Sequence, residues 1–278
     1  MKRPWAALRT ARYALPNHIE RILPGPGPDS AARRCRSLNR RGLGATLGYF
    51  QSSADRPETI VAANLAVARL LSDGAGDIYL SVKAPPMAFD RAHLRRIAEA
   101  GAKSGLKLLF DAHAPKDADS TVTAVAGLLG QFPGTGLAIP ARWRRSMADA
   151  SGFRESSARI RLVKGEWPDP DGDCDIGANY VALAERLAGR AAPVAVATHD
   201  PALAERALTL LLEAGTPCEL EQLRGLPSRR TMAVARRLGV PVRVYVPFGP
   251  GWWAYAADKA LGRPYLLSWM IRDRLGRA

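Results

Sequence analysis

The feature that most constrains the fold of this 278-residue chain is a repeated alternation of short apolar runs and longer amphipathic stretches. Eight apolar runs occur in order, at residues 45–50, 77–82, 106–110, 136–139, 160–163, 194–197, 218–223 and 242–246. Helical periodicity fills the intervals, at residues 58–71, 91–104, 121–129, 176–187, 202–214 and 228–238. Strands that alternate with helices form a parallel sheet through right-handed crossovers. Eight such units predict an α/β protein, a closed (β/α)8 barrel of the TIM type.

An N-terminal arm precedes the predicted barrel of residues 41–278, which includes a C-terminal helix. Residues 1–40 are basic and interrupted by prolines, which predicts an N-terminal arm with one or two helical turns, and the chain ends in a C-terminal helix. Asp200 before Pro201 is a typical helix start. An open, doubly wound sheet is the rival fold, but Gly42, Gly44 and Gly48 lack its glycine spacing.

The composition favours anionic partners and a reducing compartment. Forty Lys and Arg against 26 Asp and Glu give a formal charge of +14, which suits a phosphate-bearing cofactor, an acidic membrane surface or nucleic acid. The basic residues are spread along the chain, which argues against nucleic acid. Three widely spaced cysteines predict no disulfide framework, and the sequence contains no apolar run of membrane-spanning length. We expect a cytoplasmic protein whose arm packs across the bottom of the barrel, with contact to the inner face of a membrane as the alternative.

Ionisable and hydrogen-bonding residues follow six of the eight predicted strands. In a barrel of this class the carboxyl ends of all strands meet at one rim, where functional groups gather. The predicted rim residues are Lys83, Asp111, His113, Lys164, Gly165, Glu166, Trp167, Thr198, His199, Glu221, Tyr245, Pro247 and Gly249. His199 alone is more often a structural histidine. The convergence of the set therefore indicates a site.

The stretch 159–167, RIRLVKGEW, places two cations at the end of the fifth strand. Arg161 and Lys164 are costly to bury unpaired, so they either meet acidic neighbours or face an anion. The four histidines lack metal-ligand spacing, so we expect no metal, and no Ser or Cys lies in a nucleophile-elbow pattern. An organic anionic cofactor suits this rim better, with Arg161, Lys164 and the backbone of Gly165 at its phosphates.

Six motifs in register resemble those of the proline dehydrogenase family. Residues 161–165 match R-L-V-K-G, 197–200 resemble A-T-H-N, and 243–249 resemble R-x-Y-V-P-Y-G. Residues 81–83 resemble S-x-K, 111–112 the start of D-A-E, and 219–226 are a looser copy of E-F-Q-M-L-Y-G-M. The resemblance implies FAD-dependent oxidation of L-proline or a related cyclic or secondary amine. Hydride passes from the carbon next to nitrogen to FAD and leaves an imine, which is 1-pyrroline-5-carboxylate in proline catabolism.

The resemblance also implies roles for individual residues. The catalytic set is Lys83, Asp111 and Tyr245. Substrate-binding residues are Leu223, Asp258, Lys259 and Arg263. Cofactor-binding residues are Asp111, Arg161, Val163, Lys164, Gly165, Trp167, Thr198, His199 and Glu221. The resemblance to the family, and no residue of this chain, implies that a quinone-type acceptor reoxidises the flavin.

Several positions depart from the family pattern. Two arginines of Y-L-x-R-R-L-x-E-N, which hold the proline carboxylate in the family, correspond to Asp258 and Lys259. Lys259 and Arg263 are four residues apart and could rebuild part of a cationic clamp. Pro140 and Glu221 stand where the family has glutamines, and Trp167 replaces a tyrosine. Glu221 adds a negative charge that disfavours reduced anionic flavin unless the acid is protonated.

Three hypotheses follow from the sequence. The first is a flavoenzyme of the proline dehydrogenase type. The second keeps the barrel but changes the amine substrate to one that carries a cation opposite Asp258. The third is a barrel without catalysis that binds a partner through its basic surface. Flavin absorbance and an amine-substrate screen discriminate among them.

Overall fold

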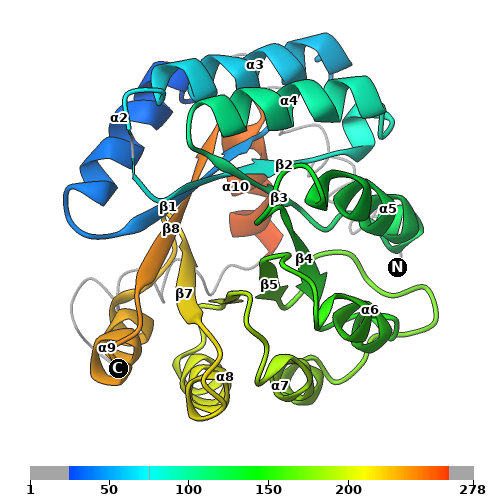
Figure 1. Ribbon diagram of the computed structural model, residues 1–278, viewed down its shortest axis with the longest axis vertical. Coiled ribbons are helices and arrows are strands. Elements are labelled where there is room, and N and C mark those ends of the chain that lie inside the picture. Colours follow the sequence, from blue (N-terminus) through cyan, green and yellow to red (C-terminus); the bar gives the residue numbers. More distant parts are fainter. Residues whose placement is uncertain (1–24, 75, 263–278) are drawn as a thin grey trace, which may run out of the picture.

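Eight parallel strands form a closed barrel in chain order, as the repeated pattern predicts (Figure 1). The computed structural model describes residues 25–74 and 76–262, with only the backbone for residues 258–262. The strands are β1 (Gly44–Tyr49), β2 (Ile78–Val82), β3 (Lys107–Phe110), β4 (Gly136–Pro140), β5 (Ile160–Val163), β6 (Val194–Ala197), β7 (Cys218–Leu223) and β8 (Val242–Phe248). Pairing of β1 with β8, from Gly44 opposite Arg243 to Tyr49 opposite Phe248, closes the ring. The fold prediction is confirmed.

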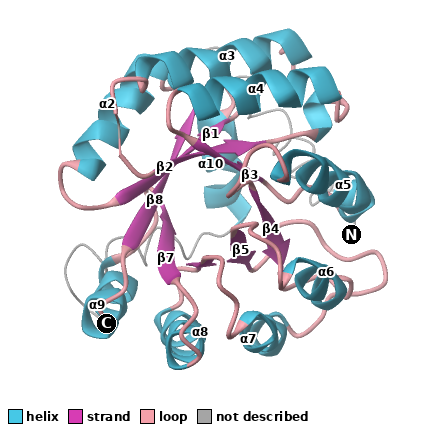
Figure 2. Ribbon diagram, viewed as in Figure 1, coloured by secondary structure: helices cyan, strands magenta, loops and turns pink. Residues whose placement is uncertain are grey.

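Helices surround the strands (Figure 2). The outer helices are α2 (Pro28–Asn39), α3 (Pro57–Leu70), α4 (Arg91–Lys103), α5 (Ala118–Leu129), α6 (Ser146–Phe153), α7 (Ile176–Leu187), α8 (Pro201–Glu213) and α9 (Arg229–Leu238), and a further helix, α10 (Trp252–Gly262), follows β8. Short 3-10 helices occupy Pro85–Met87 and Pro115–Asp117. Asp200 caps α8 by accepting a hydrogen bond from the backbone N–H of Leu203, as its sequence position predicts. The sequence pattern missed α6, which has only eight residues and includes Gly152.

The N-terminal region is more ordered than predicted, because α2 is a 12-residue helix rather than one or two turns. Pro28 fits its first turn, and Ala31, Ala32, Cys35 and Leu38 form a buried face with helical spacing. The helix packs on α3, β1 and β8, and so it covers the side of the barrel between its first and last strands. The expected packing across the barrel bottom is wrong for this part of the arm. Residues 1–24 lie outside the described residues.

The last described helix, α10, has a different position from the outer helices. It follows β8 directly, and Figure 1 shows it inside the ring of strands and helices in this view. Tyr255 and the preceding Gly251 line the cavity at the carboxyl ends of the strands. Because α2 occupies the outer position beside β8, α10 is available to border the mouth of the barrel.

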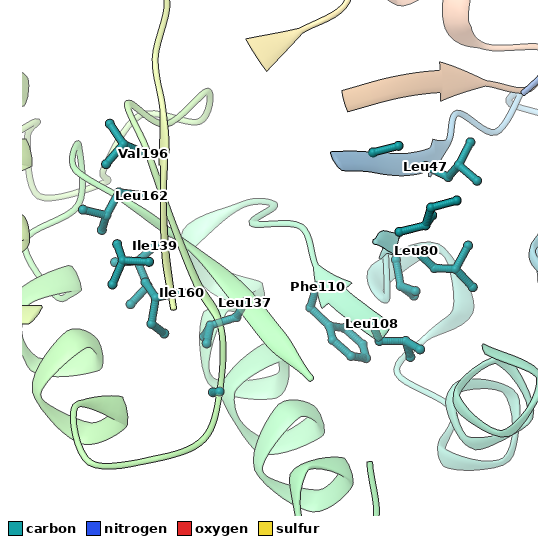
Figure 3. Close-up of a cluster of buried hydrophobic side chains, with 14 of the residues drawn as sticks. Leu47, Leu80, Leu108, Phe110, Leu137, Ile139, Ile160, Leu162 and Val196 are labelled. Carbon is teal, nitrogen blue, oxygen red and sulfur yellow. The ribbon is translucent and has the colours of Figure 1, made fainter. Parts of the chain in front are cut away.

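Strand side chains alternate between two very different environments. Outward-facing residues pack against the helices and form the apolar core, and nine of them are labelled in Figure 3: Leu47, Leu80, Leu108, Phe110, Leu137, Ile139, Ile160, Leu162 and Val196. The other face carries five buried charged residues, namely Arg159 just before β5, Arg161 on β5, Glu219 and Glu221 on β7, and Arg243 on β8. The interior of the barrel is therefore ionic where a hydrophobic layer would be ordinary.

Candidate active site

A cavity of about 470 Å³ opens at the carboxyl ends of the strands. Most of the predicted site residues line it, namely Lys83, Asp111, Arg161, Val163, Gly165, Trp167, His199, Glu221, Leu223 and Tyr245. Tyr255 also lines the cavity, as do Phe50 and Trp143, which the sequence motifs did not single out. The volume is in the range of ligand-binding pockets, so the predicted convergence on one rim defines a cavity of useful size.

Asp111, at the end of β3, is the centre of a hydrogen-bonded cluster. Its carboxylate accepts a hydrogen bond from Ser81 Oγ at 2.6 Å and one from the Tyr245 hydroxyl at 3.1 Å. It also pairs with Lys83 Nζ at 3.2 Å and with Arg161. Burial opposes ionisation of Asp111, but Lys83 and Arg161 outweigh it, and the pKa lies well below its usual value. Asp111 is thus a fixed anion that holds three pocket side chains.

The ammonium group of Lys83 contacts three oxygen atoms of the protein. Its Nζ donates to the carbonyl oxygen of Tyr49 at 2.9 Å, pairs with Asp111, and lies 3.5 Å from the Tyr245 hydroxyl. The ammonium also lies 4.0 Å from the centre of the Phe50 ring, a cation–π distance. Burial lowers the pKa of Lys83, while Asp111 raises it again in part.

Tyr245, on β8, presents an un-ionised hydroxyl to the pocket. Burial, followed by the charge of Asp111, raises the pKa of this phenol well above its ordinary value. The hydroxyl donates to Asp111 and lies within hydrogen-bonding distance of Lys83. Lys83, Asp111 and Tyr245, which the sequence places on three different strands, therefore form one connected group.

A buried ion network lies below this cluster. Glu221 accepts hydrogen bonds from Arg159 Nη2 at 2.7 Å and from Arg161 Nη1 at 3.3 Å. Glu219 pairs with Arg159 and with Arg243 Nε, the latter at 2.8 Å. Burial alone would raise the pKa of Glu221, but Arg159, Arg161 and Arg243 lower it to about 2. Glu221 is therefore an ionised carboxylate, and its negative charge is paired with Arg159 and Arg161.

Lys164 and Thr198 lie outside the cavity lining. The Lys164 side chain is 47% exposed, and its Nζ lies 3.3 Å from Asp200 Oδ2. Thr198 is buried, and its hydroxyl accepts a hydrogen bond from the backbone N–H of Asp200 at 3.2 Å. Of the two sequence-based alternatives for the cations, Arg161 and Lys164 both meet acidic neighbours.

His199 lines the cavity, but the protein engages both of its ring nitrogens. Nδ1 lies 2.7 Å from the carbonyl oxygen of Pro227, and Nε2 accepts a hydrogen bond from the backbone N–H of Leu223 at 3.1 Å. This pattern fixes a neutral ring with the proton on Nδ1. His199 therefore joins the loops after β6 and β7 and positions Leu223 in the pocket wall.

The turn after β5 brings the backbone close to Pro140, the last residue of the neighbouring strand β4. Gly165 has φ +95°, and a Cβ at this position would lie 2.9 Å from Pro140 Cβ. Trp167 follows this turn and stacks on His113 with ring centroids 6.3 Å apart. Glycine therefore permits a close approach of the backbone to the pocket at this turn.

The residues expected to bind the substrate are described only in part. Leu223 lines the cavity. Asp258 and Lys259 belong to α10, of which only the backbone is described at these positions, and Arg263 lies outside the described residues. Tyr255 on the same helix donates a hydrogen bond to Glu166 Oε2 at 3.2 Å, so α10 contacts the loop after β5.

The cavity fits a planar organic cofactor better than a metal ion. Arg161 is almost fully buried and lines the cavity, and its Nε has no hydrogen-bond partner. Aromatic rings of Trp167 and Tyr245 and the unsubstituted Gly165 also line it, as expected for a flat heterocycle. In residues 25–74 and 76–262, no three His, Cys, Asp or Glu side chains are grouped to hold a metal.

A parallel (β/α)8 barrel with a charged pocket at the carboxyl ends of its strands belongs to a large class of enzymes. Comparison with known proteins identifies its relatives. The chain is 26% identical over 275 residues to proline dehydrogenase 1 of Bacillus subtilis subsp. natto, and the match covers 92% of this chain and 90% of that protein. It is 24% identical over 287 residues to proline dehydrogenase of Deinococcus radiodurans, covering 95% and 92%. The chain is thus similar over nine tenths of its length to proteins named proline dehydrogenase, as its motifs indicate.

Solved structures support the fold. Proline utilization A (PutA) from Bdellovibrio bacteriovorus matches with a TM-score of 0.74 at 18% identity, over 86% of this chain and 32% of that one. PutA from Corynebacterium freiburgense matches with a TM-score of 0.69 at 17% identity, over 99% and 35%. The chain spans about a third of these larger proteins. No protein-family model matches the sequence, and no helix among the described residues is long and apolar enough to cross a membrane.

Proposed function

We propose that the protein is a flavin-dependent oxidoreductase that oxidises L-proline or a related cyclic secondary amine. The observation that carries this proposal is the connected group of Lys83, Asp111 and Tyr245 in the cavity, in a chain related over nine tenths of its length to proline dehydrogenases. The product is the cyclic imine, which is 1-pyrroline-5-carboxylate if the substrate is proline, and the physiological role is then proline catabolism.

We infer that FAD is the cofactor. When bound, its flavin ring supplies the acceptor for the hydride that leaves the carbon next to nitrogen. Arg161 would lie beside the ring, and Val163, Gly165 and Trp167 would form the adjoining wall. The exposed ammonium of Lys164 is suited to the phosphates outside the cavity, with Thr198 and His199 supporting the neighbouring loop.

The side chains of the pocket have separate tasks. Tyr245 and Leu223 border the space for the amine ring, and Lys83 lies beside it with its position fixed by Tyr49 and Asp111. Oxidation requires the nitrogen lone pair, so the substrate reacts as the free amine. A fixed cation at Lys83 disfavours a protonated amine next to it, and so it favours the reactive form. Orientation by these fixed groups is the main contribution of the protein.

We also infer a quinone-type electron acceptor and a cytoplasmic location, both from the resemblance to the family. The basic N-terminal region supports contact with the inner face of an anionic membrane through its Lys and Arg residues. Cosedimentation with anionic and with neutral vesicles, at low and high salt, tests this contact. If the protein does not bind anionic vesicles at low salt, the proposed membrane contact is contradicted.

The decisive experiment is an absorbance scan of freshly purified protein, followed by anaerobic titration with L-proline and with pyrrolidine. We expect flavin absorbance that is bleached by at least one of these amines. Protein that is colourless, and that binds no FAD on reconstitution, contradicts the proposed function and favours a binding module.

A further inference from the structure

Strand β1 carries a buried glycine, Gly48, close to its carboxyl end. In the sheet it lies opposite Ser81 on β2 and Pro247 on β8. An added Cβ at this residue would overlap the hydroxyl oxygen and Cζ of Tyr245 and would lie 2.8 Å from its Cε1. Glycine within a strand weakens the strand and often marks a position where other atoms approach the backbone closely. At Gly48 those atoms belong to a side chain of the proposed site.

The order of the strands explains why the Tyr245 ring passes Gly48. β1 lies between β8, which carries Tyr245, and β2, which is followed by Lys83. Asp111 follows β3, one strand further around the barrel. The Tyr245 hydroxyl nevertheless lies 3.1 Å from Asp111 Oδ2 and 3.5 Å from Lys83 Nζ. The phenol therefore reaches across the width of β1, over a residue that has no side chain in its path.

Two other side chains border the Tyr245 ring. The Phe50 ring meets it edge-on with centroids 6.4 Å apart, and the Arg161 guanidinium lies 5.4 Å from its centre. The ring is buried, and its hydroxyl is the atom nearest to an added methyl group at Gly48. Because real Cβ atoms keep at least about 3 Å from other heavy atoms, the hydroxyl would have to move. Its hydrogen bond to Asp111 is the contact that such a movement breaks.

We propose that Gly48 is a positioning residue of the pocket. Because it has no side chain, it admits the Tyr245 hydroxyl to Asp111 and Lys83, and it thereby sets the pocket wall that borders the amine ring. The inference deepens the proposed function and rests on it for the effect on catalysis. The position of Tyr245 itself can be tested without flavin or substrate.

The first experiment follows Tyr245 by NMR in the full chain without added cofactor. Protein that carries 13C at the Cζ of its seven tyrosines gives one signal for each ring, and Tyr245→Phe identifies the signal of Tyr245. In Gly48→Ala we expect this signal to move toward its position in the unfolded protein, because the hydroxyl leaves the Asp111 carboxylate. The signal of Tyr180, a buried tyrosine on α7, should stay in place. Gly127→Ala, where an added Cβ meets nothing within 4 Å, is the control and should move neither signal.

The second experiment asks whether Gly48 acts through Tyr245, by thermal melting of the single and double variants without added cofactor. Gly48→Ala should lower the melting temperature of the otherwise unchanged protein, because the methyl group and the phenol compete for one space. In the Tyr245→Ala background the same substitution should not lower it, because the ring has left that space. If Gly48→Ala alone does not fold, the double variant should still fold, for the same reason.

Kinetics connect the position of Tyr245 to the reaction. For the FAD-loaded protein we expect Gly48→Ala to lower kcat/KM for the preferred amine by at least about tenfold, since the oriented hydroxyl is lost from the pocket wall. Gly127→Ala should leave kcat/KM unchanged, because the added methyl group touches no other residue.

An unmoved Tyr245 signal in Gly48→Ala overturns the inference, as does a moved signal with unchanged kcat/KM. A change in melting temperature that is the same in both backgrounds also overturns it. Where Gly48→Ala does not fold, failure of the double variant to fold has the same meaning. If the protein binds no flavin or oxidises no amine, the proposed function fails, whereas the NMR and melting results still decide whether Gly48 positions Tyr245.

Discussion

At the scale of single residues, Asp111 connects the chemistry of the pocket to the ionic interior. Its two oxygens accept hydrogen bonds from Ser81 and Tyr245 and form ion pairs with Lys83 and Arg161. No neutral side chain of similar size can make this set of contacts. The buried cations next to it depend on this charge, because an unpaired buried cation is strongly disfavoured.

Replacement of this carboxylate by an amide should therefore disable the pocket. We expect Asp111→Asn to lower kcat/KM for the preferred amine by about 10²- to 10³-fold, since the amide removes the charge that positions Lys83 and Tyr245. Steady-state kinetics of the FAD-loaded protein measure this loss. Asp29→Asn, in the exposed first turn of α2, is the matched control. An Asp111→Asn variant with unchanged kcat/KM would remove Asp111 from the proposed mechanism.

Lys164 provides the second prediction at this scale. Its ammonium is half exposed and its partner Asp200 also caps α8, so the lysine is available to a phosphate without a large desolvation cost. We expect Lys164→Ala to weaken FAD binding by about tenfold, and the difference from the unchanged protein to shrink at high salt. Fluorescence titration with FAD at two ionic strengths measures both effects. Equal affinities at low salt would place the phosphates elsewhere.

At the scale of elements, the turn between β5 and α7 determines the shape of the pocket wall. Gly165 has a positive φ, and an added Cβ would contact both Pro140 and Arg142. We expect Gly165→Ala to destabilise the fold by about 1–3 kcal/mol and to weaken FAD binding, because the loop carrying Glu166 and Trp167 must shift. Urea unfolding and FAD titration measure the two effects. Gly127→Ala, in α5 where an added Cβ meets nothing within 4 Å, is the control and should not lose stability.

The elements also show what the sequence could and could not predict. Apolar runs bounded by helical patterns located all eight strands, because burial on both faces of a parallel strand leaves a strong local signal. The length of α2 was underestimated, because the prolines at 24, 26 and 28 were interpreted as helix breakers. Pro28 in fact occupies the first position of the helix. The rim residues were predicted from strand ends, whereas the orientation of α10 depends on tertiary packing and carries no local pattern.

The partners inside the barrel illustrate the same limit. Residues 161 and 163 of β5 share one face with residue 159 just before the strand, and residues 219, 221 and 223 share one face of β7. This alternation could have indicated that Arg159 and Glu221 share the interior. Their actual pairing, however, depends on the register across β6, which matches Arg161 to Ala195 and Ala197 to Glu221. Small alanines between the two strands leave room for the long charged side chains to meet.

At the scale of the whole molecule, a balanced ion network occupies the barrel from one end to the other. Its cations are Lys83, Arg159, Arg161 and Arg243, and its carboxylates are Asp77, Asp111, Glu219 and Glu221. Such a network is no guarantee of stability, because desolvation offsets much of the attraction. Its fully buried members do depend on the charges of their partners, and for Glu221 this dependence can be measured through pH.

Stability should fall in acid over a window set by Glu221. Its pKa is about 2 in the folded protein against an ordinary value of 4.5, so its contribution is complete above pH 4.5 and is lost as the pH falls toward 2. This contribution to the free energy of unfolding is on the order of 3 kcal/mol.

At pH 7, Glu221→Gln should lower the free energy of unfolding by about 3–5 kcal/mol, because Arg159 and Arg161 lose a buried partner. Between pH 4.5 and 2 the unchanged protein loses this extra stability, and its free energy of unfolding should approach that of the Glu221→Gln variant. Urea unfolding at pH 7, 4.5 and 2.5 measures this, with Glu213→Gln as control. A stability difference that is the same at all three pH values would show that Glu221 does not act through its charge.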